Sequence, residues 1–223
     1  MLNQIIKVSN IDKSFGQQKV LDNVSFVISE GDFVVLMGES GSGKSTLINI
    51  LSLLDTNESG KYTLFGNDVT TLSITQRSQL RREKFNIIFQ KYNLFEELTI
   101  YENLKMYLDL CELKCTDVEN TILQITQSLG LSNHLHKKVF VLSQGEKQRV
   151  AIARSMLSKK EIIIADEPTA SVDEVNRDIM IDLLKDQNKK GSTVIVATHD
   201  PKYLDFATKT LHISYGCINE RKG

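Results

Sequence analysis

The sequence has little of what marks a membrane-spanning or a nucleic-acid-binding chain. No apolar run approaches the roughly 18 residues of a membrane-spanning helix, and the longest candidates, at 33–37 and 162–165, have the length of strands. The 27 basic and 28 acidic residues nearly cancel, so the basic excess of a general nucleic-acid binder is missing. We expect no nucleic-acid partner. Because residues 1–7 lack a signal-peptide pattern, we also expect a cytoplasmic location.

Cysteine is sparse as well, with Cys111, Cys115 and Cys217. An odd, small set does not form a disulfide framework. Cys111 and Cys115 have a spacing that places both on one face of a helix, but no His or Cys partner pair stands at zinc-motif spacing. The cysteines therefore indicate neither a disulfide-stabilised domain nor a zinc site.

Apolar periodicity divides the chain into strands and helices. Residues 4–36 are predicted to be β-structure, and the continuous apolar run 33–37 is typical of a strand buried on both faces of a parallel sheet. The later segments are predicted as helix at 47–54, turns and short strands at 55–89, mostly helix at 97–142, and then alternating helix and strand at 146–157, 162–165, 175–188 and 193–197. This order predicts one α/β domain over residues 1–223, with a helical lobe inserted at about 91–145.

The segment 38–45 has the spacing Gly-x-x-x-x-Gly-Lys-Ser between a predicted strand and a predicted helix. Its glycines let backbone N–H groups turn toward phosphate oxygens, and the helix start adds positive charge. Lys44 can reach the β- and γ-phosphates, and the Ser45 hydroxyl can coordinate Mg²⁺. A chance match, in which the segment is only a turn before a helix, is on the order of one in a hundred. The predicted phosphate-binding residues are Gly38, Glu39, Ser40, Gly41, Ser42, Gly43, Lys44, Ser45 and Thr46.

Two acids, Asp166 and Glu167, follow the apolar strand 162–165. Ligand sites in parallel sheets lie at the carboxyl ends of strands, so these acids should meet the segment 38–45 at one edge of the sheet. Asp166 would then hold Mg²⁺, and Glu167 could accept a proton from an attacking water. The alternative is a pair of solvated acids that end a strand.

Four further segments resemble motifs of ATP-binding-cassette (ABC) ATPases. Residues 142–148 resemble the signature loop, Gln90 the Q-loop, residues 170–173 the D-loop, and residues 198–200 the switch-histidine segment, all in the family's order. The resemblance covers nearly the whole chain. It implies an α/β P-loop NTPase fold with a mostly parallel central sheet, an N-terminal antiparallel β subdomain and an inserted helical lobe.

The same resemblance implies roles for individual residues. Gln90 would sense Mg²⁺ and the attacking water, and His199 would contact the γ-phosphate of ATP. Phe15 stands where the family places an aromatic ring that stacks on adenine, although it could also be a half-buried strand residue. Asp173 would communicate across a dimer. The signature would bind the ATP held by the other subunit, through Ser143, Gly145 and Glu146.

The signature departs from the family pattern in two ways and also reads as a helix start. Gln144 stands where the family usually has glycine, and glutamine is costly there if the backbone needs a positive φ. Glu146 replaces a glutamine, and residues 138–140 lack the proline often found upstream. Ser143 and Glu146 also have capping-box spacing, which predicts a helix N-terminus able to face an anion.

Within the family, residues 49–55 and 89–94 look like the lipoprotein-release and macrolide-export branch. This implies an ATP-hydrolysing subunit with ATP and Mg²⁺ as cofactors. Its partners would be a second copy or a similar ATPase chain and a membrane-spanning permease subunit, at the inner face of the cell membrane. The alternative is a soluble ABC-type ATPase that acts on ribosomes or DNA, although those relatives usually carry two cassettes or a long coiled coil. A small-molecule P-loop kinase would leave the signature unexplained.

The stretch 92–98 mixes apolar and acidic residues directly after Gln90. The resemblance implies that this region receives a short helix of the membrane partner. The alternative is that Leu94, Phe95 and Leu98 fill the core of the lobe itself.

Overall fold

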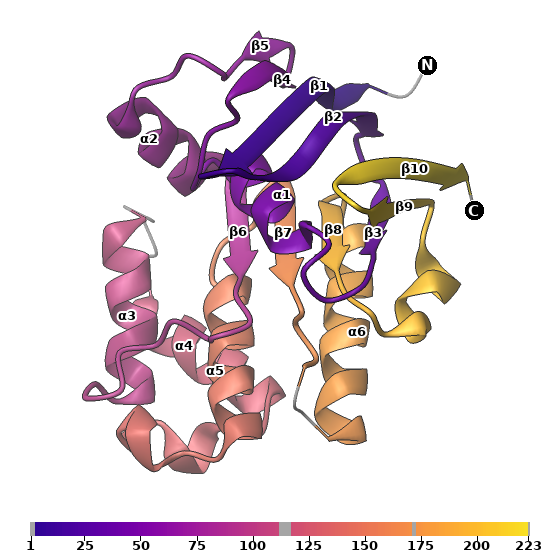
Figure 1. Cartoon of the computed structure of the whole chain (residues 1–223). Helices are drawn as coiled ribbons and strands as arrows, with labels where there is room; N and C mark the ends of the chain where they lie inside the picture. Colours follow the sequence, from indigo (N-terminus) through magenta and orange to yellow (C-terminus); the bar gives the residue numbers. More distant parts are fainter. Residues whose placement is uncertain (1–2, 112–116, 171–172, 223) are drawn as a thin grey trace.

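Two sheets form the framework of the computed structural model, which describes residues 3–111, 117–170 and 173–222 (Figure 1). Cys115, Ser171 and Val172, which were named above, lie outside these residues. An antiparallel sheet has the order β2-β1-β4-β5, and a second sheet has the order β10-β9-β3-β8-β7-β6. In the second sheet β9, β3, β8, β7 and β6 run parallel, and β10 pairs with β9 in the antiparallel sense. The expected combination of a mostly parallel central sheet and an N-terminal antiparallel sheet is confirmed.

The strands of the antiparallel sheet are β1 (Gln4–Phe15), β2 (Gln18–Ser29), β4 (Ser59–Leu64) and β5 (Asn67–Asp68). Those of the second sheet are β3 (Phe33–Met37), β6 (Phe85–Ile88), β7 (Ile162–Asp166), β8 (Thr193–Ala197), β9 (Lys209–Ser214) and β10 (Cys217–Lys222). The α-helices are α1 (Lys44–Leu51), α2 (Ile74–Lys84), α3 (Ile100–Leu110), α4 (Val118–Ser128), α5 (Gln144–Met156) and α6 (Glu174–Lys189). Short 3₁₀ helices cover Ser132–His134, Val139–Val141 and Pro201–Phe206.

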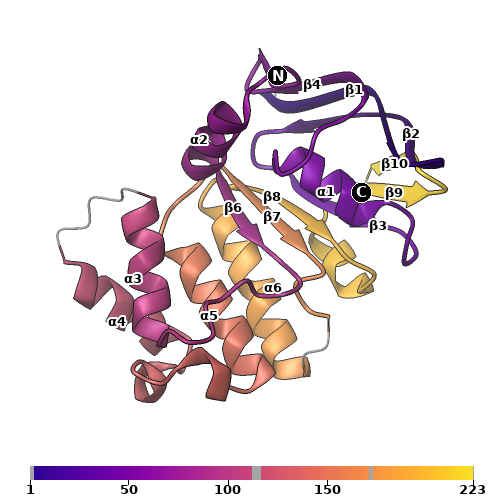
Figure 2. The ribbon, with the colours of Figure 1, turned by 60° about the vertical axis from the view of Figure 1, so that its left-hand side comes forward.

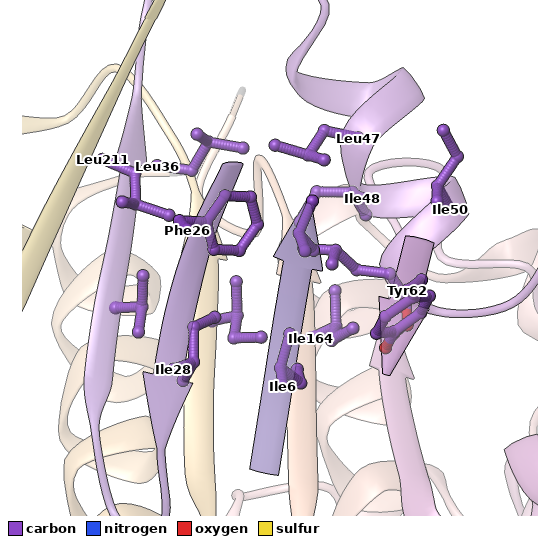
Figure 3. Packing of buried hydrophobic residues seen from close by; sticks show 14 of the residues in the cluster. Ile6, Phe26, Ile28, Leu36, Leu47, Ile48, Ile50, Tyr62, Ile164 and Leu211 are labelled. Atoms are coloured by element: carbon purple, nitrogen blue, oxygen red, sulfur yellow. Dashed lines mark hydrogen bonds between the residues drawn. The ribbon is translucent and has the colours of Figure 1, made fainter. Parts of the chain in front are cut away.

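The central sheet is buried on both faces, as its continuous apolar runs predict. In β3, Val34 and Leu36 join a core formed with α1 and the antiparallel sheet (Figure 3), whereas Phe33 and Val35 join a second core formed with α3, α4, α5 and α6. The first core places α1 between the two sheets, and α3, α4, α5 and α6 lie beyond the opposite face (Figures 1 and 2). This arrangement holds the segment between β3 and α1 at the carboxyl edge of the central sheet.

Helix α2, the hairpin of β9 and β10, and the bounds of α1 differ from the sequence prediction. Helix α2 lies in a stretch that was predicted as turns and short strands; it has no buried residue, so it carries no apolar stripe, and its readable signal was the capping box of Ser73 and Gln76. The hairpin of β9 and β10 was not predicted, and β9 lies directly beside β3. The predicted helix 47–54 begins and ends about three residues earlier, as α1.

Helix α5 packs against α3 and α4 of the helical lobe and also against β6 and α6, so it links the lobe to the central sheet. Among the residues that the structure describes, no helix combines the length and the apolar character needed to cross a membrane.

Candidate functional site

The loop between β3 and α1 is shaped by its glycines. Gly43 is the N-cap of α1 and has φ 107°, in the left-handed region that favours glycine. A Cβ atom on Gly43 would lie 2.9 Å from the carbonyl oxygen of Val20, and one on Gly38 would lie 2.5 Å from the carbonyl oxygen of Ile213. Neighbouring strands therefore press against the loop at two points, and only glycine fits at both.

Lys44 lies at the centre of the loop with its ammonium group buried. Its Nζ donates hydrogen bonds to the carbonyl oxygens of Gly38, at 2.7 Å, and Glu39, at 2.9 Å. The same Nζ lies 3.8 Å from Oε1 of Glu167. The second carboxylate oxygen of Glu167, Oε2, lies 3.0 Å from Nδ1 of His199. The structure thus brings Lys44, Glu167 and His199 together, although they come from three distant segments.

Glu167 owes its position to a strained backbone. It has φ 44°, which is uncommon for a residue other than glycine, and its N–H donates to the carbonyl oxygen of Ala197 at 2.8 Å. Such strain persists where the surroundings enforce it, and it is concentrated at functional sites. The contact with β8 turns the Glu167 side chain away from the end of β7 and toward Lys44.

Asp166, one residue earlier, faces Ser45. Burial raises the pKa of the Asp166 carboxyl group, and a hydrogen bond with Ser45 opposes this shift in part. Oδ1 of Asp166 is buried and has no hydrogen-bond partner among the described residues. A buried carboxylate oxygen without a partner, beside a hydroxyl group, fits the oxygen ligands that Mg²⁺ takes. Ser45 and Asp166 are therefore suited to hold that ion.

A cavity of about 580 Å³ opens over these groups. Its lining includes most of the predicted phosphate-binding residues together with Gln90, Glu167 and His199. Ser42 is not in this lining, and its Oγ is buried without a partner among the described residues. Two lining residues, Val20 and Ala170, were not predicted, because an apolar side chain carries no chemical signal in the sequence.

The signature segment forms the start of α5. Ser143 is the N-cap, and its Oγ accepts from the N–H of Glu146, while the Glu146 carboxylate accepts from the N–H of Ser143 at 2.8 Å and from its hydroxyl at 2.7 Å. These bonds hold the pKa of Glu146 below its ordinary value. The predicted capping box is confirmed. Nδ1 of His134 also lies 2.6 Å from the Glu146 carboxylate.

The next two residues of the signature, Gln144 and Gly145, differ in the space that is available for a side chain. Gln144 is the first residue of α5 and does not have a positive φ, so the strain considered for a glutamine at this position is absent. Gly145 is confined by a neighbour, because a Cβ atom there would lie 2.6 Å from Nδ2 of Asn176. The glycine requirement in this signature therefore falls on Gly145.

A second cavity, of about 810 Å³, lies between the signature and the segment that follows Gln90. Its lining includes Ser143, Gln144, Tyr92 and Leu94, and it shares Gln90 and Ala170 with the first cavity. Gln90 therefore lies at the boundary between the phosphate-binding loop and the helical lobe.

Six predicted residues lie outside both linings: Ser42, Gly145, Glu146 and Asp166, which are described above, and Phe15 and Asp173. Phe15 ends β1, is 55% exposed and has the ammonium group of Lys13 5.3 Å from its ring centroid. Asp173 is the N-cap of α6 and accepts from the N–H of Asn176 at 2.8 Å. Within this chain Asp173 stabilises the start of a helix, and its role across a dimer stays a prediction.

Comparison with known proteins agrees with this geometry. A family model described as "ABC transporter" matches residues 21–170. Macrolide export ATP-binding/permease proteins MacB from Campylobacter jejuni and Vibrio parahaemolyticus are both 37% identical, over 96% and 98% of this chain. The chain spans only about a third of their length, 33% and 34%. The expected resemblance to the macrolide-export branch is thus confirmed.

Among solved structures, the dimeric bacterial ABC transporter cassette MJ0796 has a TM-score of 0.91 and 33% sequence identity, with 98% of each chain covered. A dimeric post-hydrolysis state of MJ0796, bound to ADP and Pi, has a TM-score of 0.90 and 32% identity over the same coverage. The match extends over both sequence and fold, and this chain belongs to the ABC transporter family as an ATP-binding cassette.

Proposed function

We propose that this chain is the ATP-binding and ATP-hydrolysing subunit of an ABC transporter. Two copies, or one copy and a similar ATPase chain, close around two ATP molecules and drive export or envelope work by a membrane-spanning permease subunit at the inner face of the cell membrane. The observation that carries the proposal is the meeting of Lys44, Glu167 and His199 at one cavity walled by the phosphate-binding loop.

The side chains divide the chemistry between them. The backbone N–H groups of the loop and the ammonium group of Lys44 bind the phosphates, where Lys44 exchanges its carbonyl partners for phosphate oxygens. Glu167 takes the proton of the attacking water. His199, within hydrogen-bond distance of Glu167, contacts the γ-phosphate and orients that carboxylate. Phe15 stacks on adenine with the ring face that Lys13 leaves open.

Mg²⁺ belongs to this proposal because of the oxygen ligands present. Ser45 and Asp166 would hold the ion, and Gln90, which lines the same cavity as Ser45, would be a further oxygen ligand. When bound, Mg²⁺ neutralises charge on the β- and γ-phosphates. The cation also offsets the cost of burying the Asp166 carboxylate.

Two substitutions separate binding from hydrolysis. Lys44→Ala should lower ATP turnover about a hundredfold or more and weaken ATP binding, because a buried phosphate contact is worth several kcal/mol. Glu167→Gln keeps the shape of the side chain but removes the base, so it should bind ATP, stall before hydrolysis and accumulate a dimer. Turnover, equilibrium binding of a fluorescent ATP analogue and light scattering measure the three effects. Wild-type turnover in either variant, with an unchanged circular dichroism spectrum, would overturn its assigned role.

The partner contact is proposed for the segment that follows Gln90. Phe95 is 55% exposed, whereas Leu94 packs on the core of the lobe, so only part of the apolar content is used internally. The Phe95 backbone is held on both sides by Asn103, whose Oδ1 accepts from the Phe95 N–H at 2.9 Å and whose Nδ2 donates to the Phe95 carbonyl oxygen at 3.0 Å. Phe95 is thus an exposed ring on a fixed backbone.

The same segment is joined to the signature helix. Lys147 of α5 donates to Glu96 at 2.8 Å, and the guanidinium group of Arg154 donates to the carbonyl oxygens of Tyr92 and Asn93. Binding of a partner to this segment would therefore affect the position of α5 as well as that of Gln90. This supports the segment as the place where the ATP state passes to the permease.

The double variant Phe95→Ala, Glu97→Lys tests this surface. It should retain ATP binding and lose both co-purification with the permease and permease-stimulated hydrolysis. Tyr215→Asn is the matched control, because Tyr215 is an exposed aromatic residue on a distant turn and asparagine tolerates its positive φ. If the double variant still associates with the permease as the wild type does, the docking surface lies elsewhere on the chain. The ATPase assignment would not be affected by that result.

A further inference from the structure

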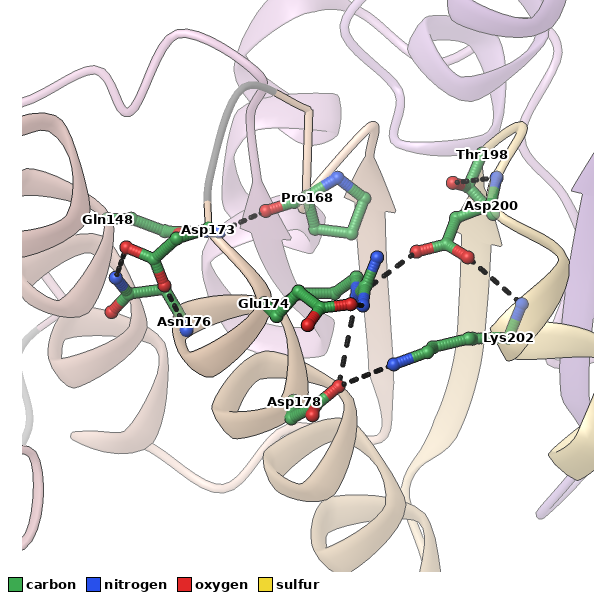
Figure 4. A network of polar contacts seen from close by, with 10 residues as sticks. Gln148, Pro168, Asp173, Glu174, Asn176, Asp178, Thr198, Asp200 and Lys202 are labelled. Atoms are coloured by element: carbon green, nitrogen blue, oxygen red, sulfur yellow. Dashed lines mark hydrogen bonds and ion pairs between the residues drawn. The ribbon is translucent and has the colours of Figure 1, made fainter.

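The first turn of α6 lies beside the signature helix. Asn176 is 6% exposed; its Nδ2 donates to the carboxylate of Asp173 at 2.7 Å, and its Oδ1 accepts from the guanidinium group of Arg149 on α5. Nδ2 of Asn176 is also the atom that leaves no space for a Cβ on Gly145. Asn176 therefore connects the D-loop to the signature helix of the same chain, and Figure 4 shows its contact with Asp173.

The next residue, Arg177, points toward the switch-histidine loop. Its Nη2 donates to Glu174 at 2.8 Å, and its Nε lies 3.8 Å from Asp178 and 3.9 Å from Asp200. The last two distances are too long for hydrogen bonds, so these contacts are electrostatic. Asp200 directly follows His199 in the sequence.

A second ion pair joins the same two elements. Nζ of Lys202 lies 3.2 Å from Asp178 of α6, and the backbone N–H of Lys202 donates to the Asp200 carboxylate at 3.0 Å (Figure 4). The N–H of Asp200 donates in turn to Oγ1 of Thr198 at 3.0 Å. Charges of α6 thus contact the loop at two residues that follow His199, Asp200 and Lys202.

In the proposed dimer, the signature of a chain and the His199 of that chain act on different ATP molecules. The structure joins these two groups through consecutive residues of one helix turn. We propose that Asn176 and Arg177 are positioning residues that transmit closure of the signature on one ATP to the placement of His199 at the other. This inference rests on the proposed function and names the contacts within one chain that would couple the two sites.

Arg177 suits such a role better than a purely structural one. Its partners Glu174 and Asp178 are mostly exposed, 82% and 58%, and ion pairs with such exposed carboxylates contribute little to folding. A separate contact, from Gln148 of α5 to the carbonyl oxygen of Pro168, keeps α5 attached next to Glu167 whatever happens at Arg177 (Figure 4). Removal of the Arg177 charge should therefore disturb His199 without displacing the base or the signature.

The test compares Arg177→Met, which keeps the aliphatic stem, with Arg177→Lys, which keeps the charge. Arg177→Met should lower ATP turnover about fivefold, with the KM for ATP within about twofold of wild type, and should reduce the Hill coefficient for ATP toward 1. Arg177→Lys should restore most of both. Asn176→Ala should show the same loss of cooperativity, because it cuts the other half of the connection.

Asp200→Asn completes the experiment, because the amide oxygen still accepts from Lys202 while the charge is lost. If Arg177 acts through Asp200, Arg177→Met combined with Asp200→Asn should be no slower than either single variant. A wild-type Hill coefficient of 1, unchanged kinetics in Arg177→Met, or a loss that follows a lowered Tm and is not rescued by lysine would each overturn the inference. Absence of ATP turnover in the wild-type chain would instead overturn the proposed function.

Discussion

At the scale of single residues, Gln144 and Gly145 are neighbours with opposite tolerance for substitution. Gln144 is an unstrained helical residue, whereas Gly145 faces the amide of Asn176. Gly145→Ala should therefore shift Asn176, lower turnover about tenfold and cost about 1–2 kcal/mol of unfolding free energy. Gln144→Gly should keep turnover within about twofold and cost about 0.5–1 kcal/mol through backbone entropy. Steady-state kinetics and urea denaturation of both variants measure these effects, and faster turnover in Gln144→Gly would show that glutamine does strain the loop.

The residues of the phosphate-binding loop could be predicted because they form one short, contiguous sequence pattern, Gly-x-x-x-x-Gly-Lys-Ser. Asp166 and Glu167 could be placed beside it by the rule that parallel strands end at one edge of a sheet. Asn176 and Arg177 could not, because their partners lie about 25 positions away along the chain, in α5 and in the loop after β8. No local pattern distinguishes them from other polar residues in a helix.

At the scale of elements, α3 is joined to β6 by Tyr107. The Tyr107 hydroxyl donates to Oδ1 of Asn86 at 2.8 Å, and Asn86 donates to the carbonyl oxygens of Ser155 and Ser158. Burial raises the pKa of Tyr107 to about 12. In the unfolded chain a tyrosine ionises near pH 10. Between about pH 10 and 12 the Tyr107 hydroxyl therefore ionises in the unfolded state but stays protonated in the folded state.

The sign of the resulting pH dependence follows from that difference. The stabilisation is fully present below about pH 10 and is lost as the pH rises toward 12, and buried Tyr62 and Tyr203, whose pKa values are also raised, act in the same direction. Tyr107→Phe should reduce the slope near pH 11 by up to about 1.4 kcal/mol per pH unit and should cost about 1 kcal/mol at pH 7. Urea titrations at pH 7, 10 and 11 measure this. Exposed Tyr215→Phe is the control, and an unchanged slope in Tyr107→Phe would contradict the prediction.

Prediction of the elements from sequence worked where burial leaves a pattern. The runs that became β3, β7 and β8 are buried on both faces and were placed within about one residue. Helix α2 was missed because none of its residues is fully buried and only Leu80 packs on the core, so the helix has no apolar stripe whose period could be detected. The position of β9 beside β3 depends on pairing between distant parts of the chain, which short-range patterns do not encode.

At the scale of the whole molecule, the proposed dimer predicts that two inactive variants regain activity when they are mixed. Ser143→Arg should block the signature while leaving the Lys44 site intact, and Lys44→Ala should do the reverse. Each variant alone should be inactive. A mixed dimer contains one site with both an intact loop and an intact signature, so mixing should restore part of the turnover. Absence of rescue at every mixing ratio, with mixed dimers shown to form by differential tagging, would argue against a site shared between chains.

The pairing of β3 has a consequence for how the protein is made. β3 (Phe33–Met37) is completed on one side by β8 (Thr193–Ala197) and on the other by β9 (Lys209–Ser214), so the support of the phosphate-binding loop comes from residues synthesised more than 150 positions later. Contacts of such sequence separation form late, whereas the antiparallel pairing of β1 and β2 is local. During translation the N-terminal sheet can form first, and the loop at residues 38–45 stays without its flanking strands until residue 214 has left the ribosome. We therefore expect the nascent chain to begin ATP hydrolysis only after β9 has been synthesised.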